Sequence, residues 1–210
     1  MSGENTLEHL LTTEYSHCET NIRIVHEQRD RWIRFYLGFV AAIQAIPLSI
    51  LALQKEISLN VQDLSFWTFV SISSVFLYAT GVLVLMICIY SRCRTVEYTN
   101  ELNTLRFVIH SRLTEGGIIT SGCKLPRDRC VEAYRTSGAD FFRHLLITFI
   151  VSLFIPILII SLYQNLSTPS IVAATLGYIL SISLLLAIRR KILVSFDKEL
   201  QLRQQELAYV

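Results

Sequence analysis

Four stretches of this sequence contain no Asp, Glu, Lys or Arg, and each is long enough to cross a lipid bilayer as a helix. They are residues 35–53, 67–90, 145–163 and 171–188, between 18 and 24 residues long. An α-helix rises about 1.5 Å per residue, so these lengths match a hydrocarbon core about 30 Å thick. Backbone groups in lipid must be paired within a helix or a closed barrel, and the alternating pattern of barrel strands is absent. The sequence therefore predicts an all-α polytopic membrane protein with four transmembrane helices.

The basic residues lie almost entirely on one side of the predicted membrane. Of the 19 Lys and Arg residues, only Lys55 lies in the segments after the first and third spans, residues 54–66 and 164–170. Because cytoplasmic segments retain Lys and Arg during insertion, both termini should be cytoplasmic, with an outer loop over 54–66 and an outer turn over 164–170. The other 18 lie in three segments that would form a small cytoplasmic helical bundle: an amphipathic helix over 1–34, a helical hairpin over 91–144 and a helical tail over 189–210.

The N-terminal arm carries apolar residues at helical spacing along one side. Charged residues fill the other positions, so another surface must cover the apolar stripe. It could pack against the protein's own cytoplasmic helices, form a coiled-coil seam between subunits, or bind a cytoplasmic protein partner. The candidate interface residues are Leu7, Leu11, Cys18, Ile22 and Val25.

Several residues are expected to shape the ends of the helices. Arg29, Arg31, Trp32 and Arg34 are typical of a belt that anchors a span at the lipid headgroups. Past the fourth span, Arg189 begins a basic run that should stop transfer into the membrane.

Turn and helix-breaking residues predict further boundaries. A second amphipathic helix should begin near Arg94 and end before Gly116, and a shorter helix should begin at about Asp128. Pro47 and Pro156 lie within spans, where each removes a backbone hydrogen bond and should kink its helix.

Small and hydroxyl-bearing residues share faces of two spans. Ser71, Ser74, Tyr78 and Gly81 lie on one face of the second span, which could hydrogen-bond to a neighbouring helix or line a pore in an oligomer. One four-helix subunit is too small to hold such a pore alone. In the fourth span, small residues repeat every four positions and predict a groove for close helix packing: Ala173, Gly177 and Ser181.

The sequence contains no recognisable catalytic constellation. No ionisable Asp, Glu, His, Lys or Arg lies within the four stretches, which argues against a secondary transporter or an intramembrane protease. Outside them there is no phosphate-binding loop, no HExxH motif and no serine-nucleophile motif. We expect no enzymatic activity, no metal and no cofactor. Membrane lipids are the expected surroundings, and the absence of a basic stripe with interleaved aromatics argues against nucleic-acid binding.

Two motifs at helix boundaries resemble those of small bacterial four-span membrane proteins. They are EQRDRWIRFY at residues 27–36 and EYTNELNTLR at residues 97–106, and the resemblance covers roughly residues 20–110. Some of these proteins accompany anti-phage defence systems, in which a cytoplasmic sensor or regulator acts with a membrane subunit that perturbs the envelope. The membrane subunit of the Kiwa system is one candidate relative. The resemblance implies a multi-pass protein of the bacterial inner membrane.

Two functions follow as hypotheses. In the first, the chain is an oligomeric membrane effector or sensor that acts with a cytoplasmic partner to perturb or permeabilise the membrane. In the second, it is a non-conducting anchor or scaffold that recruits a cytoplasmic partner. The two differ in whether the polar faces of the spans carry ions or only pack.

Overall fold

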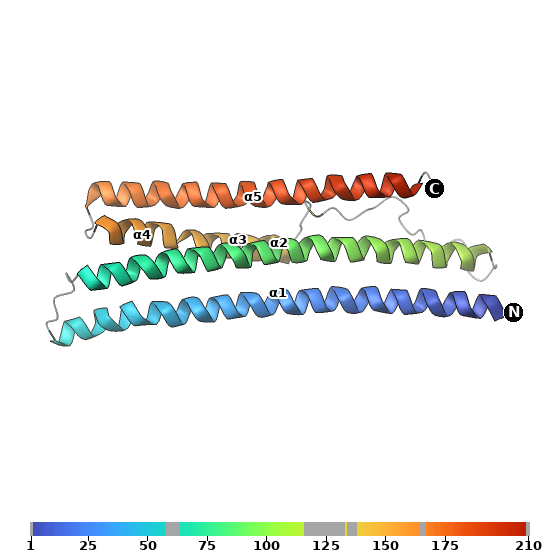
Figure 1. Ribbon diagram of the computed structural model, residues 1–210, viewed down its shortest axis with the longest axis horizontal. Coiled ribbons are helices and arrows are strands. Elements are labelled where there is room, and N and C mark those ends of the chain that lie inside the picture. Colours follow the sequence, from blue (N-terminus) through green and yellow to red (C-terminus); the bar gives the residue numbers. More distant parts are fainter. Residues whose placement is uncertain (1, 58–63, 116–132, 134–137, 164–166, 209–210) are drawn as a thin grey trace. The chain divides into compact units, whose positions relative to one another are not determined.

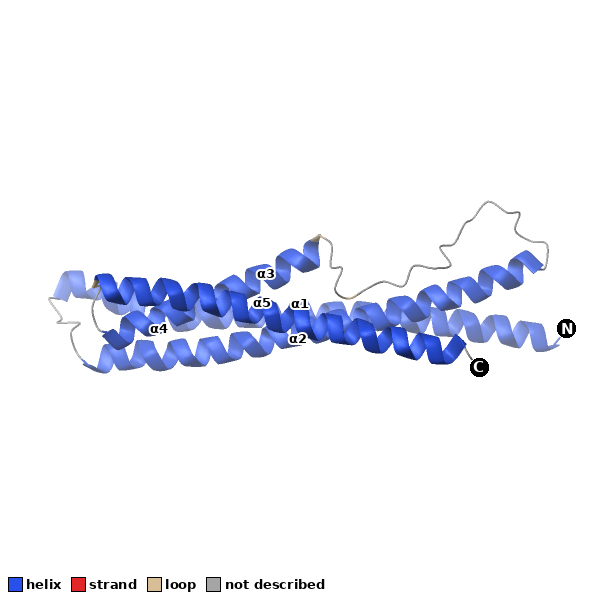
Figure 2. Ribbon diagram, turned by 90° about the horizontal axis from the view of Figure 1, so that it is seen from above, coloured by secondary structure: helices blue, strands red, loops and turns tan. Residues whose placement is uncertain are grey.

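The computed structural model describes residues 2–57, 64–115, 133, 138–163 and 167–208, and every regular element in these ranges is an α-helix (Figures 1 and 2). Four of these helical segments are long and apolar enough to cross a membrane: one in α1, one in α2, one that comprises α3 and α4, and one in α5. This confirms the predicted all-α class with four candidate spans. The helices are α1 (Ser2–Ile57), α2 (Leu64–Glu115), α3 (Ala139–Ser152), α4 (Phe154–Tyr163) and α5 (Thr168–Ala208).

The chain divides into two units, and α1, α2 and α5 contribute residues to both. The polar unit comprises Met1–Arg29, Tyr90–Thr136 and Leu193–Val210. The membrane unit comprises Asp30–Ile89 and Ser137–Ile192 and contains nearly all of the four charge-free stretches.

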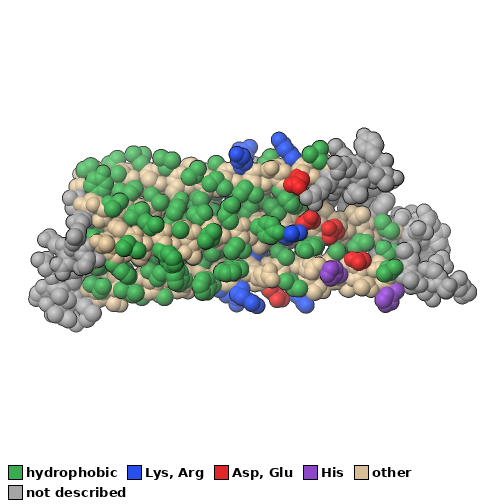
Figure 3. All heavy atoms as spheres, in the orientation of Figure 1, with side chains coloured by type: hydrophobic (Ala, Val, Ile, Leu, Met, Phe, Trp, Pro, Cys, Tyr) green, Lys and Arg blue, Asp and Glu red, His purple; other side chains and the backbone are tan. Residues whose placement is uncertain are grey.

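The membrane unit has the polarity of a protein that faces lipid. Within its charge-free stretches, large apolar side chains are exposed: Ile72 is 65% exposed and Leu180 is 68% exposed. Figure 3 shows one face, on which hydrophobic side chains cover the charge-free stretches. Hydroxyl groups lie inside, since Thr148 and Ser152 are completely buried. In water the opposite arrangement would be more stable, so the natural surroundings of this surface are hydrocarbon.

Contacts in the membrane unit fix how its helices are aligned. Ser71 meets Ser161 and Gly81 lies against Val151, so α2 runs antiparallel to α3 and α4. Ser181 of α5 contacts Ser152 of α3, and Arg189, eight residues later in α5, contacts His144, eight residues earlier in α3. The helices α3 and α5 are therefore also antiparallel.

Proline affects the two spans differently. α1 continues without interruption through Pro47. The third span is interrupted at Leu153, where α3 ends and α4 begins, and Pro156 is the third residue of α4. Pro156 has no N–H to donate to the Ser152 carbonyl, which explains why regular helical bonding fails at this turn.

In the second polar segment, one expected boundary turns out differently and another lies outside the described residues. The helix expected to begin near Arg94 is a continuation of α2, because no glycine or proline interrupts the chain between the span and Glu115. α2 ends at Glu115, directly before Gly116. The short helix expected from about Asp128 lies outside the described residues, and α3 begins at Ala139, after Gly138 with a φ of 67°. Glycine adopts that left-handed conformation without steric cost.

Candidate functional site

The interior of the membrane unit contains hydroxyl groups from four helices, α2, α3, α4 and α5. Ser71 Oγ lies 2.7 Å from Ser161 Oγ, and this hydrogen bond joins α2 to α4. One turn further along α2, Ser74 is only 1% exposed, and its Oγ has no hydrogen-bond partner among the described residues. A buried hydroxyl without a partner costs about 1–3 kcal/mol, so Ser74 stands out among the buried side chains of the unit.

A second group of hydroxyls lies further along α2. Ser181 Oγ is 3.0 Å from Ser152 Oγ and 3.4 Å from the Tyr78 hydroxyl. A hydroxyl has one proton to donate and lone pairs to accept, so Ser181 donates to one neighbour and accepts from the other. This contact joins α2, α3 and α5. We refer to the residues of both groups as the hydroxyl row: Ser71, Ser74, Tyr78, Ser152, Ser161 and Ser181.

A buried His–Arg pair lies on the continuation of the same helix faces. His144, Thr148 and Ser152 follow one another at intervals of four along α3, and all are buried. Arg189 Nε donates a 3.1 Å hydrogen bond to His144 Nδ1, and the guanidinium carbon lies 5.5 Å from the centre of the Phe141 ring. Because a guanidinium can only donate, His144 Nδ1 is the acceptor of this hydrogen bond.

Arg189 begins the basic run that is expected to stop transfer, and it is the buried member of that run. It is only 7% exposed. Arg190 and Lys191 are exposed and remain available for that role. The pairing with His144 and the Phe141 ring explains how Arg189 is accommodated inside the unit.

The glycine and small residues of the spans provide close packing. A Cβ added to Gly81 would collide with the hydroxyl of Tyr36 and with Val151. Tyr36 is completely buried, and its hydroxyl donates a 3.2 Å hydrogen bond to the Leu77 carbonyl. Gly81 thus makes the space in which a tyrosine of α1 reaches α2.

The expected groove of the fourth span is occupied within the chain. A Cβ added to Gly177 would lie 2.7 Å from Ile159 Cδ1 of α4. Ala173 is half-buried, whereas its neighbour Ala174 is buried. Gly177 and Ser181 thus pack α5 against α4 and α3.

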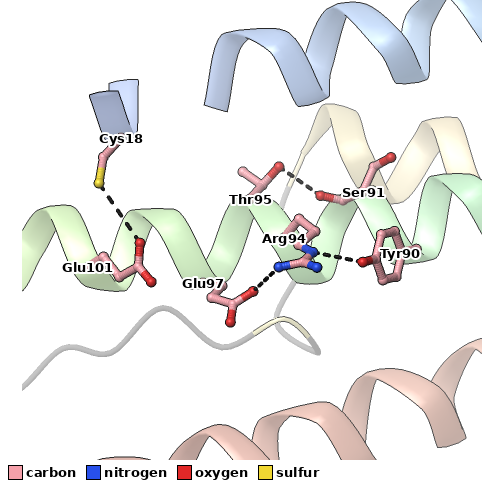
Figure 4. Close-up of polar contacts among 7 residues, drawn as sticks. All are labelled: Cys18, Tyr90, Ser91, Arg94, Thr95, Glu97 and Glu101. Carbon is pink, nitrogen blue, oxygen red and sulfur yellow. Dashed lines mark hydrogen bonds and ion pairs between the residues drawn. The ribbon is translucent and has the colours of Figure 1, made fainter. Parts of the chain in front are cut away.

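In the polar unit, Cys18 of the N-terminal stripe lies against α2. It is 5% exposed, and its Sγ is 3.9 Å from Glu101 Oε2 (Figure 4). Burial, together with the negative charges of Glu101 and Glu14, raises the pKa of the Cys18 thiol. Burial is also the main cause that raises the pKa of the Glu101 carboxyl.

The other residues of this stripe are less enclosed. Leu11, Ile22 and Val25 are half-buried, and the side chain of Leu7 lies outside the described residues. A neighbouring contact also joins α1 to α2: Arg106 donates a 2.7 Å hydrogen bond to the Tyr15 hydroxyl. The stripe is thus partly covered within its own chain. Its exposed parts could still contact a partner or a second subunit.

Arg29 differs from the other three residues of the predicted headgroup belt. Arg31, Trp32 and Arg34 are exposed, as a belt requires. The prediction is wrong for Arg29, which is 2% exposed and donates a 3.0 Å hydrogen bond to His26 Nδ1. Arg29 belongs to the interior of the polar unit.

Two further polar-unit contacts involve α2 and α5. The backbone N–H of Ala133, which is completely buried, donates a 2.7 Å hydrogen bond to Asp197 Oδ1 of α5. On α2, Arg94 Nε donates to the Tyr90 hydroxyl at 2.8 Å, and its Nη1 lies 3.2 Å from Glu97 Oε2 (Figure 4). Burial raises the pKa of the nearby Cys93 thiol to about 11. In the parts of the chain that the structure describes, no three His, Cys, Asp or Glu side chains gather as metal ligands would.

Sequence reasoning identified four of the six residues of the hydroxyl row, namely Ser71, Ser74, Tyr78 and Ser181, and missed the other two. Ser152, Ser161, His144 and Arg189 were not predicted as site residues. The spacing of His144, Thr148 and Ser152 could have identified this face, since polar residues at intervals of four in an apolar helix predict a buried polar face. Which helix faces that stripe is a property of the fold.

The chain matches no protein-family model, no curated protein and no solved structure.

Proposed function

We propose that the chain is an integral membrane effector or sensor that assembles as a homo-oligomer and acts with a cytoplasmic protein partner to permeabilise the membrane. The observation that carries this proposal is the hydroxyl row inside an apolar exterior. A bundle that only anchors a partner needs no polar interior, and the unpartnered Ser74 hydroxyl costs stability without contributing to packing. Polar groups held in a membrane interior at such a cost commonly mark functional sites.

The proposed location is the bacterial inner membrane with both termini in the cytoplasm. The distribution of Lys and Arg supports this orientation, since 18 of 19 lie in the terminal segments and the segment between the second and third spans. The polar unit would then face the cytoplasm, where a soluble partner could bind it.

The proposed setting is an anti-phage defence system. The resemblance of residues 27–36 and 97–106 to small four-span proteins supports it. Its test is a plaque assay on bacteria that carry the chain with its neighbouring genes. Phage should form plaques more efficiently on bacteria that carry the Ser74→Ala variant than on bacteria that carry the intact chain. Equal plating efficiency on the two strains would contradict this setting.

A non-conducting anchor is the second candidate, and specific contacts favour it. Ser71 is hydrogen-bonded to Ser161, Tyr78 lies next to Ser181, and the Tyr36 side chain occupies the space beside Gly81. Three of the four residues considered for pore lining are therefore engaged within a single chain. If the chain is an effector, charge must pass along these engaged side chains, or the side chains must rearrange to open a path.

Two measurements on the full chain separate these candidates. Light scattering of the detergent-solubilised protein, corrected for bound detergent, gives the number of subunits. Ion flux is then measured in liposomes for the intact chain, for Ser71→Leu, and for Ser183→Leu as a control on an exposed position of α5.

The effector proposal predicts a discrete oligomer and ion flux that falls at least about tenfold in Ser71→Leu, because the substitution fills the polar interior with a hydrocarbon side chain. Ser183→Leu should conduct like the intact chain. Absence of flux from correctly assembled protein would favour the anchor.

A further inference from the structure

We infer that the species that crosses the membrane unit is the proton, carried along the hydroxyl row with the help of a water molecule at Ser74. This inference rests on the proposed function and names the permeant species for it. It concerns the interior of one membrane unit, so it requires no central pore between subunits.

The direct contacts of the row determine what can pass. Ser71 and Ser161 are 2.7 Å apart, and Ser152 and Ser181 are 3.0 Å apart. These are ordinary hydrogen-bond distances, which leave no room for an ion between the oxygens. A proton needs no such room, because it passes along a hydrogen bond. Each hydroxyl can accept a proton on its oxygen and give up the one that it carries.

The proton balance of such a step is closed. A proton enters at one end of the row, each hydroxyl and water passes on the proton it carried before, and a proton leaves at the other end. No side chain changes its net protonation, and the hydroxyls rotate back before the next transfer. The step needs no oxidant and no reductant.

Ser74 lies where the direct contacts are interrupted. It is three residues after Ser71 and four before Tyr78, so the three share one face of α2 with about 5–6 Å between successive Cβ atoms. That separation is spanned by two hydrogen bonds through one water. Ser74 Oγ is buried and has no protein partner among the described residues, so a water beside it would supply the hydrogen bond that it lacks. A water at Ser74 would therefore join the Ser71–Ser161 pair to the group around Tyr78.

Two further hydroxyl groups are buried near the ends of the helices that carry the row. Ser170, at the start of α5, is completely buried and donates a 2.7 Å hydrogen bond to the Ser167 carbonyl. Thr148 lies one turn from Ser152 on α3 and donates a 2.8 Å hydrogen bond to the His144 carbonyl. Buried hydroxyl groups thus occur on α2, α3, α4 and α5.

Alkali ions fit this interior poorly. Selective cation sites surround the ion with several carbonyl oxygens or carboxylates at once. Among the described residues, most hydroxyls of the row are paired with one another, Ser74 is the unpartnered one, and no carboxylate belongs to the row. Near one end of the row, Arg189 brings a positive charge next to His144. The carboxylates of Asp30 and Asp140 are paired with Arg143, and these side chains are partly exposed.

The test measures proton entry into liposomes that contain the full chain. A potassium gradient with valinomycin drives protons inward, and a trapped pH-sensitive dye reports them. Passage of potassium and of chloride is measured in separate runs without valinomycin. The variants are Ser74→Ala, which removes the unpartnered hydroxyl without adding bulk, and Ser183→Ala as the matched control at an exposed serine of the same unit.

The inference predicts proton entry above that of protein-free liposomes, about a tenfold fall in Ser74→Ala, and no change in Ser183→Ala. Proton entry that is equal in Ser74→Ala and the intact chain would overturn it. Passage of potassium or chloride as fast as protons would overturn it too, while the proposed permeabilising function would stand. Absence of all flux from correctly folded protein would contradict both.

Discussion

Arg189 of α5 donates a hydrogen bond to His144 of α3, and both side chains are buried at the end of the third and fourth candidate spans. The pair holds together two helices that are far apart in sequence. It also satisfies a guanidinium inside a unit whose surface is apolar.

Arg189→Leu should therefore destabilise the protein more than Arg190→Leu. The first substitution removes the donor to His144 and the cation over the Phe141 ring, whereas Arg190 is exposed. A hydrogen bond to a charged group contributes about 1.5–3 kcal/mol, and Arg189→Leu should lose free energy of unfolding in that range. Thermal unfolding in detergent measures the difference. Both variants lose one basic residue next to the same span, so equal unfolding temperatures would mean that Arg189 acts only through topology.

Gly81→Ala should destabilise the membrane unit, because the new Cβ collides with the Tyr36 hydroxyl and Val151. Overpacking of this kind costs about 1–3 kcal/mol. Gly38→Ala is the control, since a Cβ at Gly38 has nothing within 4 Å. The unfolding midpoints of the two variants should separate, with only Gly81→Ala lowered. A Gly81→Ala variant as stable as Gly38→Ala would show that α1 and α2 do not approach each other at this point.

Asp197→Ala should expose the backbone amide of Ala133 to exchange. This buried N–H donates to Asp197 Oδ1 at 2.7 Å, and removal of the acceptor costs about 1–3 kcal/mol. Hydrogen–deuterium exchange of the peptide that contains Ala133 should be faster in Asp197→Ala. Asp197→Asn keeps a carbonyl oxygen that can accept the hydrogen bond. Its exchange rate should therefore lie between that of Asp197→Ala and that of the intact chain. Identical exchange in all three proteins would rule out the contact.

Cys18 should be alkylated slowly by iodoacetamide at neutral pH. The thiolate is the reactive form, and the pKa of the Cys18 thiol is raised by burial and by Glu101, so less thiolate is present than in an ordinary cysteine. The rate should rise with pH and reach half of its maximum above the ordinary thiol pKa of about 8.5.

Glu101→Gln should speed this reaction, because loss of a nearby negative charge lowers the pKa of the thiol. Glu19→Gln is the control, since Glu19 is exposed and adjacent to Cys18 in sequence without contributing to the shift. Site-resolved mass spectrometry over a time course gives both rates. If Glu101→Gln reacts no faster than Glu19→Gln, the two side chains are not neighbours.

The four spans could be predicted from the sequence because membrane crossing depends on local properties. About 20 residues without charge are enough to define a candidate span, whichever helices it later contacts. The distribution of Lys and Arg likewise predicts an orientation without knowledge of packing. The continuity of α2 past Arg94 was missed because a change from apolar to polar composition was taken as the start of a new helix.

The partners of the site could not be predicted in the same way. Ser152 and Ser183 are both serines in apolar helices, yet one is completely buried and the other is exposed. Which of them lies inside depends on the register between α3 and α5. His144 and Arg189 were missed because charged and titratable residues at the end of a span are usually solvated, and only their pairing explains their burial.

The most direct test of the central claim is the membrane potential of bacteria that produce the full chain, read with a voltage-sensitive dye. The account predicts that cells with the intact chain are depolarised relative to cells with equal amounts of Ser74→Ala in the membrane, because only the intact chain keeps the hydroxyl row complete. Equal potentials in the two strains, at equal amounts of folded protein, would contradict a conducting interior and leave the hydroxyl row a packing feature.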